Sequence, residues 1–338
     1  MHHIGTVPAL GETETAPLHA CVGRVLATSV LARHTHPPDN MSAMDGYAVR
    51  IADATAGAKL HVIGEAAAGH PFAGQVRSGT CVRVFTGSVI PDGADHVVVV
   101  DRDEGGAAEV AMAVGGTAVG LDVTDEAAIV DLVRETERNI GPIDLFVSNA
   151  GYVTLGGLEA PVEDLNRMWE VHVLAHLYAA KAVIPSMADR GDGYLLNTAS
   201  AAGLLSQFGS LHYAVTKHAA VALAEWIAIT HGHQGIKVSV LCPQAVDTNI
   251  VANSPNAAAM QAGGADVAGA DGHLTAEEAV EVVVEALREE RFHVLPHPEV
   301  GEYYRRKGDD VDRWIGGMQR WQERMFVGDL HPASWLTG

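Results

Sequence analysis

The spacing of hydrophobic positions changes along this chain and divides it into two unlike parts. Residues 1–104 contain short valine-rich runs at 59–65, 80–87 and 95–101, separated by Gly, Pro and Asp. Short apolar runs bounded by turn-forming residues are typical of β-strands. We therefore expect residues 1–104 to form a small, mainly β module.

Residues 105–338 have a different pattern, in which strand-like runs alternate with longer helical patterns. The strand-like runs lie at 117–121, 144–148, 194–198, 237–242 and 292–296. Helical periodicity covers residues 124–139, 162–183, 211–226 and 276–290. Alternating strands and helices indicate a parallel sheet with helices on both faces. We therefore expect an α/β fold over residues 105–338, preceded by the smaller β module.

Three further segments carry local predictions. Thr124 or Asp125 can cap the helix at 124–139, because both residue types accept hydrogen bonds from a helix N-terminus. Residues 251–274 are rich in Gly and Ala without periodicity, which indicates a long loop. Near the C-terminus, helical spacing predicts an amphipathic helix that packs on the domain or on a second subunit, through Trp314, Met318, Trp321 and Met325.

Composition and charge narrow the classes of partner. The formal net charge is −20, from 42 acidic and 22 basic residues, and it opposes binding to nucleic acid or to an anionic membrane. No apolar run approaches the roughly 20 residues that span a bilayer, and the N-terminus lacks a signal-peptide pattern. The three cysteines lie far apart, which fits a reducing compartment. We expect a cytoplasmic protein without nucleic-acid or membrane partners.

The 18 histidines raise the question of a metal site. The tightest groups are His2 with His3, His34 with His36, and His231 with His233, which lie among Gly, Pro and Thr. None has a third histidine or a carboxylate at the helical spacing that metal ligands need. We therefore interpret these histidines as loop residues and expect no metal site formed by histidines.

The helical pattern at 211–226 contains Tyr213 and Lys217, four residues apart and hence on one helical face. A free phenol titrates near pH 10, and a nearby ammonium group favours the phenolate. Such a pair suits proton transfer to or from a substrate oxygen. Ser200 follows the strand at 194–198, and Asn149-Ala150-Gly151 follows the strand at 144–148. Ligands of open α/β sheets bind at such strand ends.

Several motifs in this order make residues from about 107 to 338 resemble the short-chain dehydrogenases/reductases. They are DVTD at 122–125, SNAG at 148–151, Ser200, and YAVTK at 213–217. The resemblance implies a Rossmann-like fold and NAD(P)-dependent oxidoreduction of an alcohol or carbonyl. It implies that Tyr213 is the general acid/base, that Ser200 binds the reacting oxygen, and that Lys217 lowers the pKa of Tyr213 and holds the nicotinamide ribose.

The same resemblance implies a set of residues that bind NAD or NADP. Asp122 and Val123 would flank the adenine. Asn149, Ala150 and Gly151 would line the cofactor, and Val246 and Thr248 would contact the nicotinamide carboxamide.

This sequence departs from that family in three places. His172 replaces an asparagine of the catalytic set, and a histidine is still able to relay a proton. Gln244 stands where a glycine is usual. The opening strand, glycine-rich turn, helix and second strand of the family are not found where they are expected. The nearest glycine patterns, 115–122 and 86–93, lack the strand–turn–helix context of a dinucleotide-binding turn.

Residues 1–104 resemble the N-terminal part of the molybdopterin molybdenumtransferases. The resemblance rests mainly on SAMDGYAVR at 42–50 and on the run at 82–101. It implies insertion of molybdate into adenylylated molybdopterin, with Mg²⁺ and with Asp45 and Thr86 near the active site. The large pterin-binding domain of those enzymes would have to follow residue 104, where the dehydrogenase-like segment begins.

The sequence thus predicts a fusion of two fragments. The favoured function is NAD(P)-dependent oxidoreduction of a small-molecule alcohol or carbonyl by a homo-oligomer, with Ser200, Tyr213, Lys217 and His172 as catalytic residues. The second interpretation is a molybdopterin molybdenumtransferase. The third is an inactive fusion product or a binding module, because missing central strands leave a sheet edge that needs a cover.

Overall fold

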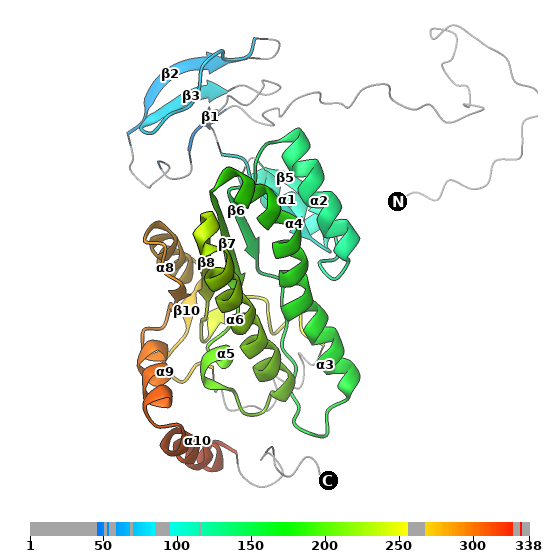
Figure 1. Ribbon diagram of the computed structural model, residues 1–338, viewed down its shortest axis with the longest axis vertical. Helices are drawn as coiled ribbons and strands as arrows, with labels where there is room; N and C mark the ends of the chain where they lie inside the picture. The colour runs from blue at the N-terminus through cyan, green and yellow to red at the C-terminus, as the bar shows by residue number, and fades with distance from the viewer. Residues whose placement is uncertain are drawn as a thin grey trace, which may run out of the picture.

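The first part of the chain forms a small β-sheet in the computed structural model (Figure 1). The structure describes residues 46–50, 53, 59–67, 70–84, 95–114, 116–255, 268–326 and 332. The sheet consists of β1 (Gly46–Ala48), β2 (His61–Ala66) and β3 (Thr80–Val84). In it β3 is central, antiparallel to β1 and parallel to β2. Val82 and Ala66 are fully buried in its core, so the expected β module is confirmed.

The second part contains a parallel sheet of four strands in the order β11-β8-β7-β6. Its strands are β6 (Leu145–Ser148), β7 (Gly193–Thr198), β8 (Ile236–Leu241) and β11 (His293–Val294). Two further short strands, β9 (Val246–Asp247) and β10 (Leu274–Thr275), pair in parallel beyond β8. Parallel pairing brings the carboxyl ends of β6, β7 and β8 to one edge, as the alternating pattern predicts.

Helices surround this sheet. They are α2 (Glu126–Asn139), α3 (Val162–Trp169), α4 (Ala175–Arg190), α5 (Ala202–Leu205), α6 (Leu211–His231), α8 (Ala276–Arg288), α9 (Glu299–Asp309) and α10 (Val311–Met325). The long helices α4 and α6 contact β6, β7 and β8 and are drawn in front of them in Figure 1, whereas α8 contacts β8 and β11. Trp314 and Trp321 both lie in α10, so the helix predicted from their spacing is confirmed.

The main core lies between the sheet and helices α4 and α6. Leu195 and Val240 from the strands pack with Val183, Met187 and Ala224 from the two helices, and all five are at most 1% exposed. Full burial of one such Leu, Val or Met side chain contributes about 1.5–3 kcal/mol to folding. This core therefore fixes α6, the helix that carries Tyr213 and Lys217, against the strands.

The helical stretch Val162–Arg190 is long and apolar enough to cross a membrane by length and composition alone, and it is the one such stretch among the described residues. However, 44% of its most apolar window is buried inside the protein. Its members Val183 and Met187 belong to the main core, and core packing accounts for its apolar character.

The segment before residue 117 requires a correction. From the sequence we predicted that the run at 95–101 belongs to the first β module. We also predicted that the second strand of the dinucleotide fold is missing. In the structure β4 (Val98–Asp101) pairs in parallel with β5 (Thr117–Gly120), and α1 (Glu104–Val114) connects them and packs on both. A β–α–β unit is therefore present. The boundary at residue 104 stays a prediction, although β4 and β5 pair across it.

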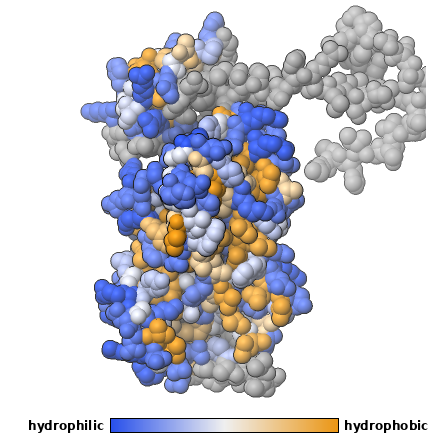
Figure 2. Space-filling view, viewed as in Figure 1, coloured by the Kyte–Doolittle hydropathy of each residue, from blue (hydrophilic) through white to orange (hydrophobic). Residues whose placement is uncertain are grey.

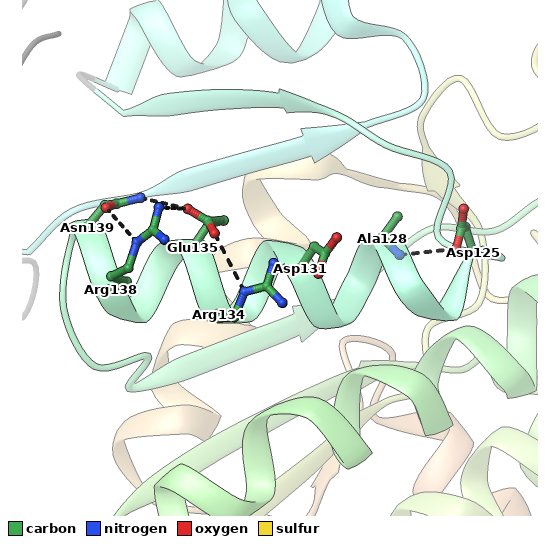
Figure 3. A network of polar contacts seen from close by, with 7 residues as sticks. All are labelled: Asp125, Ala128, Asp131, Arg134, Glu135, Arg138 and Asn139. Carbon is green, nitrogen blue, oxygen red and sulfur yellow. Dashed lines mark hydrogen bonds and ion pairs between the residues drawn. The ribbon is translucent and has the colours of Figure 1, made fainter. Parts of the chain in front are cut away.

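Helix α2 follows β5 and begins as predicted. Asp125 is the N-cap residue, and its carboxylate accepts a hydrogen bond of 3.1 Å from the Ala128 amide (Figure 3). Exposed ion pairs continue along the helix from Arg134 to Asp131 and from Arg138 to Glu135. Exposed pairs of this kind contribute little each, about 0.3–0.5 kcal/mol. The cap and the apolar stripe of α2 therefore decide where the chain turns back toward β6.

Candidate active site

Ser200 lies just beyond the carboxyl end of β7, as expected. Its hydroxyl accepts a hydrogen bond from the Ala202 amide at 3.1 Å and donates one to the Pro243 carbonyl at 3.4 Å. The side chain is largely buried. These contacts hold the hydroxyl between the ends of β7 and β8, the edge at which ligands of open α/β sheets bind.

Tyr213 and Lys217 occupy the first turns of α6, and both are buried. The Lys217 ammonium donates a hydrogen bond of 2.9 Å to the Thr198 carbonyl at the end of β7. It also lies 5.6 Å from the centre of the Tyr213 ring. The helix therefore brings the phenol and the ammonium together, and the end of β7 fixes the ammonium.

Burial dominates the titration of both groups. It raises the pKa of the Tyr213 phenol above its usual value of 10.0, and a hydrogen bond with Ser200 opposes that increase. Burial also lowers the pKa of the Lys217 ammonium to about 8. The net direction for Tyr213 is opposite to the lowering that the family resemblance implied, because loss of solvent outweighs the stabilisation of the phenolate.

His172 reaches the same place from a local irregularity in a long helix. A π-helical segment, Glu170–Leu174, separates α3 from α4 and carries His172, which is fully buried. Its Nδ1 lies 2.9 Å from Thr216 Oγ1, and its Nε2 accepts a hydrogen bond from the Tyr152 amide at 3.3 Å. The imidazole also contacts the Tyr213 ring edge-on, with ring centres 5.6 Å apart.

The hydrogen-bond partners assign one tautomer to His172. The Thr216 hydroxyl donates to the His212 carbonyl at 2.8 Å, so it accepts from Nδ1 of His172. Nε2 is then the unprotonated nitrogen that accepts from Tyr152. Burial and the Lys217 charge hold the pKa of His172 well below 6.5, so the ring is neutral at physiological pH. A proton relay through His172 stays a prediction.

The segment after β6, residues 149–151, lies beside the catalytic-type cluster. The Asn149 side chain accepts a hydrogen bond of 2.9 Å from the Thr198 hydroxyl, which ties the ends of β6 and β7 together. A Cβ atom at Gly151 would lie 3.3 Å from His172 Nε2 and 3.6 Å from Lys217 Nζ. Asn149, Ala150 and Gly151 thus lead into the catalytic-type cluster, and the glycine keeps the backbone close to it.

Asp122 and Val123 lie in the turn between β5 and α2. The Asp122 carboxylate accepts hydrogen bonds from the Thr124 amide at 2.9 Å and from the Thr124 hydroxyl at 2.8 Å. These bonds lower the pKa of Asp122. The observed role of Asp122 is to close this turn, and contact of Asp122 and Val123 with adenine stays a prediction.

Val246 lies in β9, and Thr248 follows that strand, so both come after the end of β8. Thr248 Oγ1 accepts a hydrogen bond of 3.3 Å from the Ile250 amide. Gln244 stands just before them and donates from Nε2 to Asp271 at 2.9 Å. The Tyr303 hydroxyl donates to the same carboxylate at 2.9 Å. Gln244 therefore joins this loop to α9 through a side-chain contact that a glycine lacks.

Sequence reasoning missed Asp101, which ends β4. Its carboxylate accepts a hydrogen bond of 2.9 Å from the Asp103 amide and is exposed. The sequence contained a signal for Asp101: this acidic residue ends a run of four valines, and a helical pattern follows it at once. Assignment of that run to the β module concealed it.

Two predicted features are not described by the structure. Asp45 and Thr86, the residues of the molybdenumtransferase alternative, lie outside the described residues. The predicted loop at 251–274 is described only at 251–255 and 268–274. There Ser254 accepts a hydrogen bond of 3.0 Å from the Val153 amide, which joins the start of this loop to the segment after Gly151.

Comparison with known proteins identifies the class to which this fold and site belong. The family model "short chain dehydrogenase" matches residues 86–259, slightly more than half of the 338 residues. The chain belongs to the short chain dehydrogenase family. Residues 2–144 match the model "MoeA N-terminal region (domain I and II)", so both suspected resemblances are confirmed. The two matched ranges overlap over residues 86–144.

Individual relatives agree with this assignment. A 1-deoxy-11-beta-hydroxypentalenate dehydrogenase of Streptomyces exfoliatus is 33% identical over 59% of this chain and 71% of its own length. An inactive 2-(S)-hydroxypropyl-CoM dehydrogenase 2 of Xanthobacter autotrophicus is 37% identical over 44% of this chain and 66% of its own. The relatives therefore include a protein named as inactive.

A solved structure supports the fold. A short chain dehydrogenase/reductase of Burkholderia phymatum in complex with NAD superposes with a TM-score of 0.57 and is 27% identical. The superposition covers 66% of this chain and 86% of that one. The expected Rossmann-like α/β fold is thus confirmed.

Proposed function

We propose that this protein is an NAD(P)-dependent oxidoreductase that interconverts an alcohol and a carbonyl, with Tyr213 as the general acid/base. One observation carries the proposal. Ser200, Tyr213, Lys217 and His172, from three separate elements, are all buried at the carboxyl end of β7. Buried polar groups gathered at one strand end in this fold favour a reaction site over a packing role alone.

The chain's own groups supply the proton chemistry. When a carbonyl is reduced, the Tyr213 phenol gives its proton to the substrate oxygen, which Ser200 orients. In the reverse direction the phenolate takes the proton of the alcohol. Because the pKa of Tyr213 is raised, the phenol form predominates at neutral pH, and the site is prepared for carbonyl reduction. Thr198 holds the Lys217 ammonium 5.6 Å from the centre of the Tyr213 ring, and in this proposal its charge would stabilise a developing phenolate.

The residues present fit the nicotinamide end of a dinucleotide better than its pyrophosphate. Because Gly151 has no side chain, its backbone lies close to His172 and Lys217, an arrangement that suits a flat ring and its ribose. A bound nicotinamide would supply or accept the hydride. Among the described residues, no glycine-rich turn joins a first strand to a helix N-terminus that would hold the pyrophosphate. Binding of the phosphates is therefore the weakest point of the fit.

Asp101 supports a preference for NAD over NADP. A carboxylate at the end of the second strand of such folds accepts a hydrogen bond from the adenine ribose and repels a 2′-phosphate. The Asp103 amide holds the Asp101 carboxylate at the end of β4. The acidic residue at this position thus favours the cofactor without the extra phosphate.

Titration of the full chain with NADH and NADPH, followed by cofactor fluorescence, tests this function. We expect saturable binding of NADH and weaker binding of NADPH. The Lys217→Met variant should lose most of the affinity, whereas Lys181→Met, a change of an exposed lysine on α4, should not. If neither cofactor binds at about 1 mM, the range of the weakest specific complexes, the proposal fails.

The proposed enzyme is a homo-oligomer. Several apolar side chains of α4 and α6 face solvent, among them Trp226 at 59% and Ile229 at 83% exposure. Figure 2 shows apolar side chains gathered over the middle of the molecule, where Figure 1 draws these two helices. Contiguous exposed apolar surface of this kind marks protein contacts. Analytical ultracentrifugation of wild-type and Ile229→Asp protein tests it, and a wild-type monomer at all concentrations contradicts it.

The molybdenumtransferase alternative rests on the match of residues 2–144 to the MoeA N-terminal region. Molybdate-dependent release of AMP from adenylylated molybdopterin separates it from the oxidoreductase. Activity in that assay, with no binding of NADH, would reverse the order of the two functions.

A further inference from the structure

The short strand β9, which follows β8, is held in place by residues 268–274. It pairs in parallel with β10 in a two-stranded sheet, and Figure 1 draws β10 between α8 and α9. Just before β9, the Ala245 amide donates a hydrogen bond of 3.1 Å to the Ala268 carbonyl. The Ala245 carbonyl accepts one of 3.1 Å from the Leu274 amide. The position of β9 therefore depends on what fixes residues 268–274.

Three side chains fix that segment, and we call them the latch: Gln244, Asp271 and Tyr303. Gln244 Nε2 donates to Asp271 Oδ2 at 2.9 Å. The Tyr303 hydroxyl donates to Asp271 Oδ1 at 2.9 Å. Each oxygen of the Asp271 carboxylate thus accepts a hydrogen bond, and such bonds are stronger than bonds between neutral groups.

Both donors of the latch are themselves held in place. The backbone amide of Gln244 donates to His297 Nδ1 at 3.3 Å. On α9, Val300 is fully buried in the main core, and Tyr303 packs against the same core. Burial first, and then the bond to Asp271, raise the pKa of the Tyr303 phenol, so it remains a donor at neutral pH. The latch therefore connects residues 268–274, and through them β9, to fixed parts of the protein.

The placement of Gln244 has a cost in stability. Its Nε2 bonds to Asp271, whereas its Oε1 is buried and receives no hydrogen bond from any residue that the structure describes. A buried carbonyl oxygen without a partner loses solvation that nothing replaces. What Gln244 holds explains its place better than stability does. It holds the segment that leads to Val246 and Thr248, the residues expected to contact the nicotinamide carboxamide.

We propose that the latch fixes Val246 and Thr248 against a bound nicotinamide, and that Gln244 is a positioning residue that controls how fast the cofactor leaves. Gln244 acts through Asp271 and not by touching the reacting atoms. This role rests on the proposed function, because it requires that Val246 and Thr248 contact the cofactor. It adds a control of cofactor release, a step that limits turnover in many enzymes.

An exchange of donor and acceptor tests the latch. Gln244→Glu removes the donor and places a carboxylate opposite Asp271. We expect NADH to dissociate about tenfold faster from this variant, with an unchanged association rate. The double variant Gln244→Glu/Asp271→Asn restores an amide–carboxylate pair and leaves Tyr303 a carbonyl acceptor. Its dissociation rate should return to within about twofold of the wild type. Stopped-flow fluorescence of NADH with the full chain measures both rates.

Hydrogen exchange of the cofactor-free protein separates a local effect from loss of the fold. Gln244→Glu should accelerate exchange of the Ala245 and Leu274 amides about tenfold. The Cys242 amide, which is bonded to β11, should exchange at the wild-type rate. Gln319→Ala changes an exposed glutamine on α10 and should alter neither the three amides nor NADH dissociation.

Failure of the latch and failure of the proposed function give different results. If wild-type protein binds NADH and Gln244→Glu releases it at the wild-type rate, the latch is wrong and the proposed function stands. The same holds if the double variant releases NADH as fast as Gln244→Glu, or if the Cys242 amide is accelerated with the others. If wild-type protein binds neither NADH nor NADPH, the proposed function fails, and the role of the latch in release fails with it.

Discussion

His172 Nδ1 lies 2.9 Å from the hydroxyl of Thr216, the residue that immediately precedes Lys217 on α6. The contact joins the π-helical segment in one helix to the turn that carries the ammonium in another. Because Thr216 also bonds back to the His212 carbonyl, the imidazole is held in one orientation beside Tyr213. The site thus depends on a rigid neutral histidine, and its chemistry depends on the buried phenol and ammonium.

Replacement of Tyr213 by Phe should remove the acid/base with little change in packing. We expect kcat to fall by about two to four orders of magnitude with NADH affinity unchanged. In the wild type, alcohol oxidation should increase as the pH rises toward the raised pKa of Tyr213, because it needs the phenolate. Initial rates with secondary alcohols and ketones across pH test this. A Tyr213→Phe variant with the wild-type pH profile would exclude Tyr213 as the base.

Gly151→Ala should weaken nicotinamide binding. The new Cβ would approach His172 Nε2 to 3.3 Å and Lys217 Nζ to 3.6 Å, and so displace side chains beside which we place the cofactor. We expect NADH affinity to fall by roughly tenfold, about 1.4 kcal/mol, with a small fall in melting temperature because buried His172 has to shift. Gly308→Ala on α9 is the matched control, because its Cβ would meet no atom within 4 Å. Equal affinity in both variants would contradict the assigned position.

Asp101→Asn should reduce discrimination against NADP. The variant keeps the shape of the side chain and loses the charge that repels a 2′-phosphate. We expect the ratio of NADH to NADPH affinity to fall by about tenfold. Asp189→Asn, an exposed change on α4, controls for net charge. If both variants alter the ratio equally, the effect comes from the overall acidity of the protein and not from Asp101.

Buried His176 should make stability depend on pH. Burial lowers its pKa from 6.5 to about 3, so the unfolded chain takes up a proton before the folded one does. The stabilisation is present above pH 6.5 and is lost as the pH falls toward 3, by up to about 1.4 kcal/mol per unit. Denaturant unfolding between pH 7 and 4 measures this dependence.

The His176→Leu variant should show a shallower loss of stability on acidification than the wild type. His233→Leu should not, because His233 is exposed and meets solvent in both states. A wild-type slope in His176→Leu would assign the acid sensitivity to other groups, of which buried His172 is the first candidate.

Much of the fold followed from local pattern. The period of the apolar residues predicted β6, β7, β8 and the helices between them, because a side chain's face depends on its own position in a strand or helix. The pairing of β4 shows the limit of this reasoning. A short apolar run looks the same in either part, and only its parallel pairing with β5 places it.

The sequence by itself determined which groups are available for chemistry: Tyr213 and Lys217 one helical turn apart, and Ser200 and Asn149 after strands. The tertiary structure decided their electrostatics. Removal from water raised the pKa of Tyr213, contrary to expectation, and a π-helical segment turned His172 toward Thr216. It also left Leu145 and Val147 of β6 exposed. Burial and strand pairing join residues distant in the chain, so no local pattern contains them.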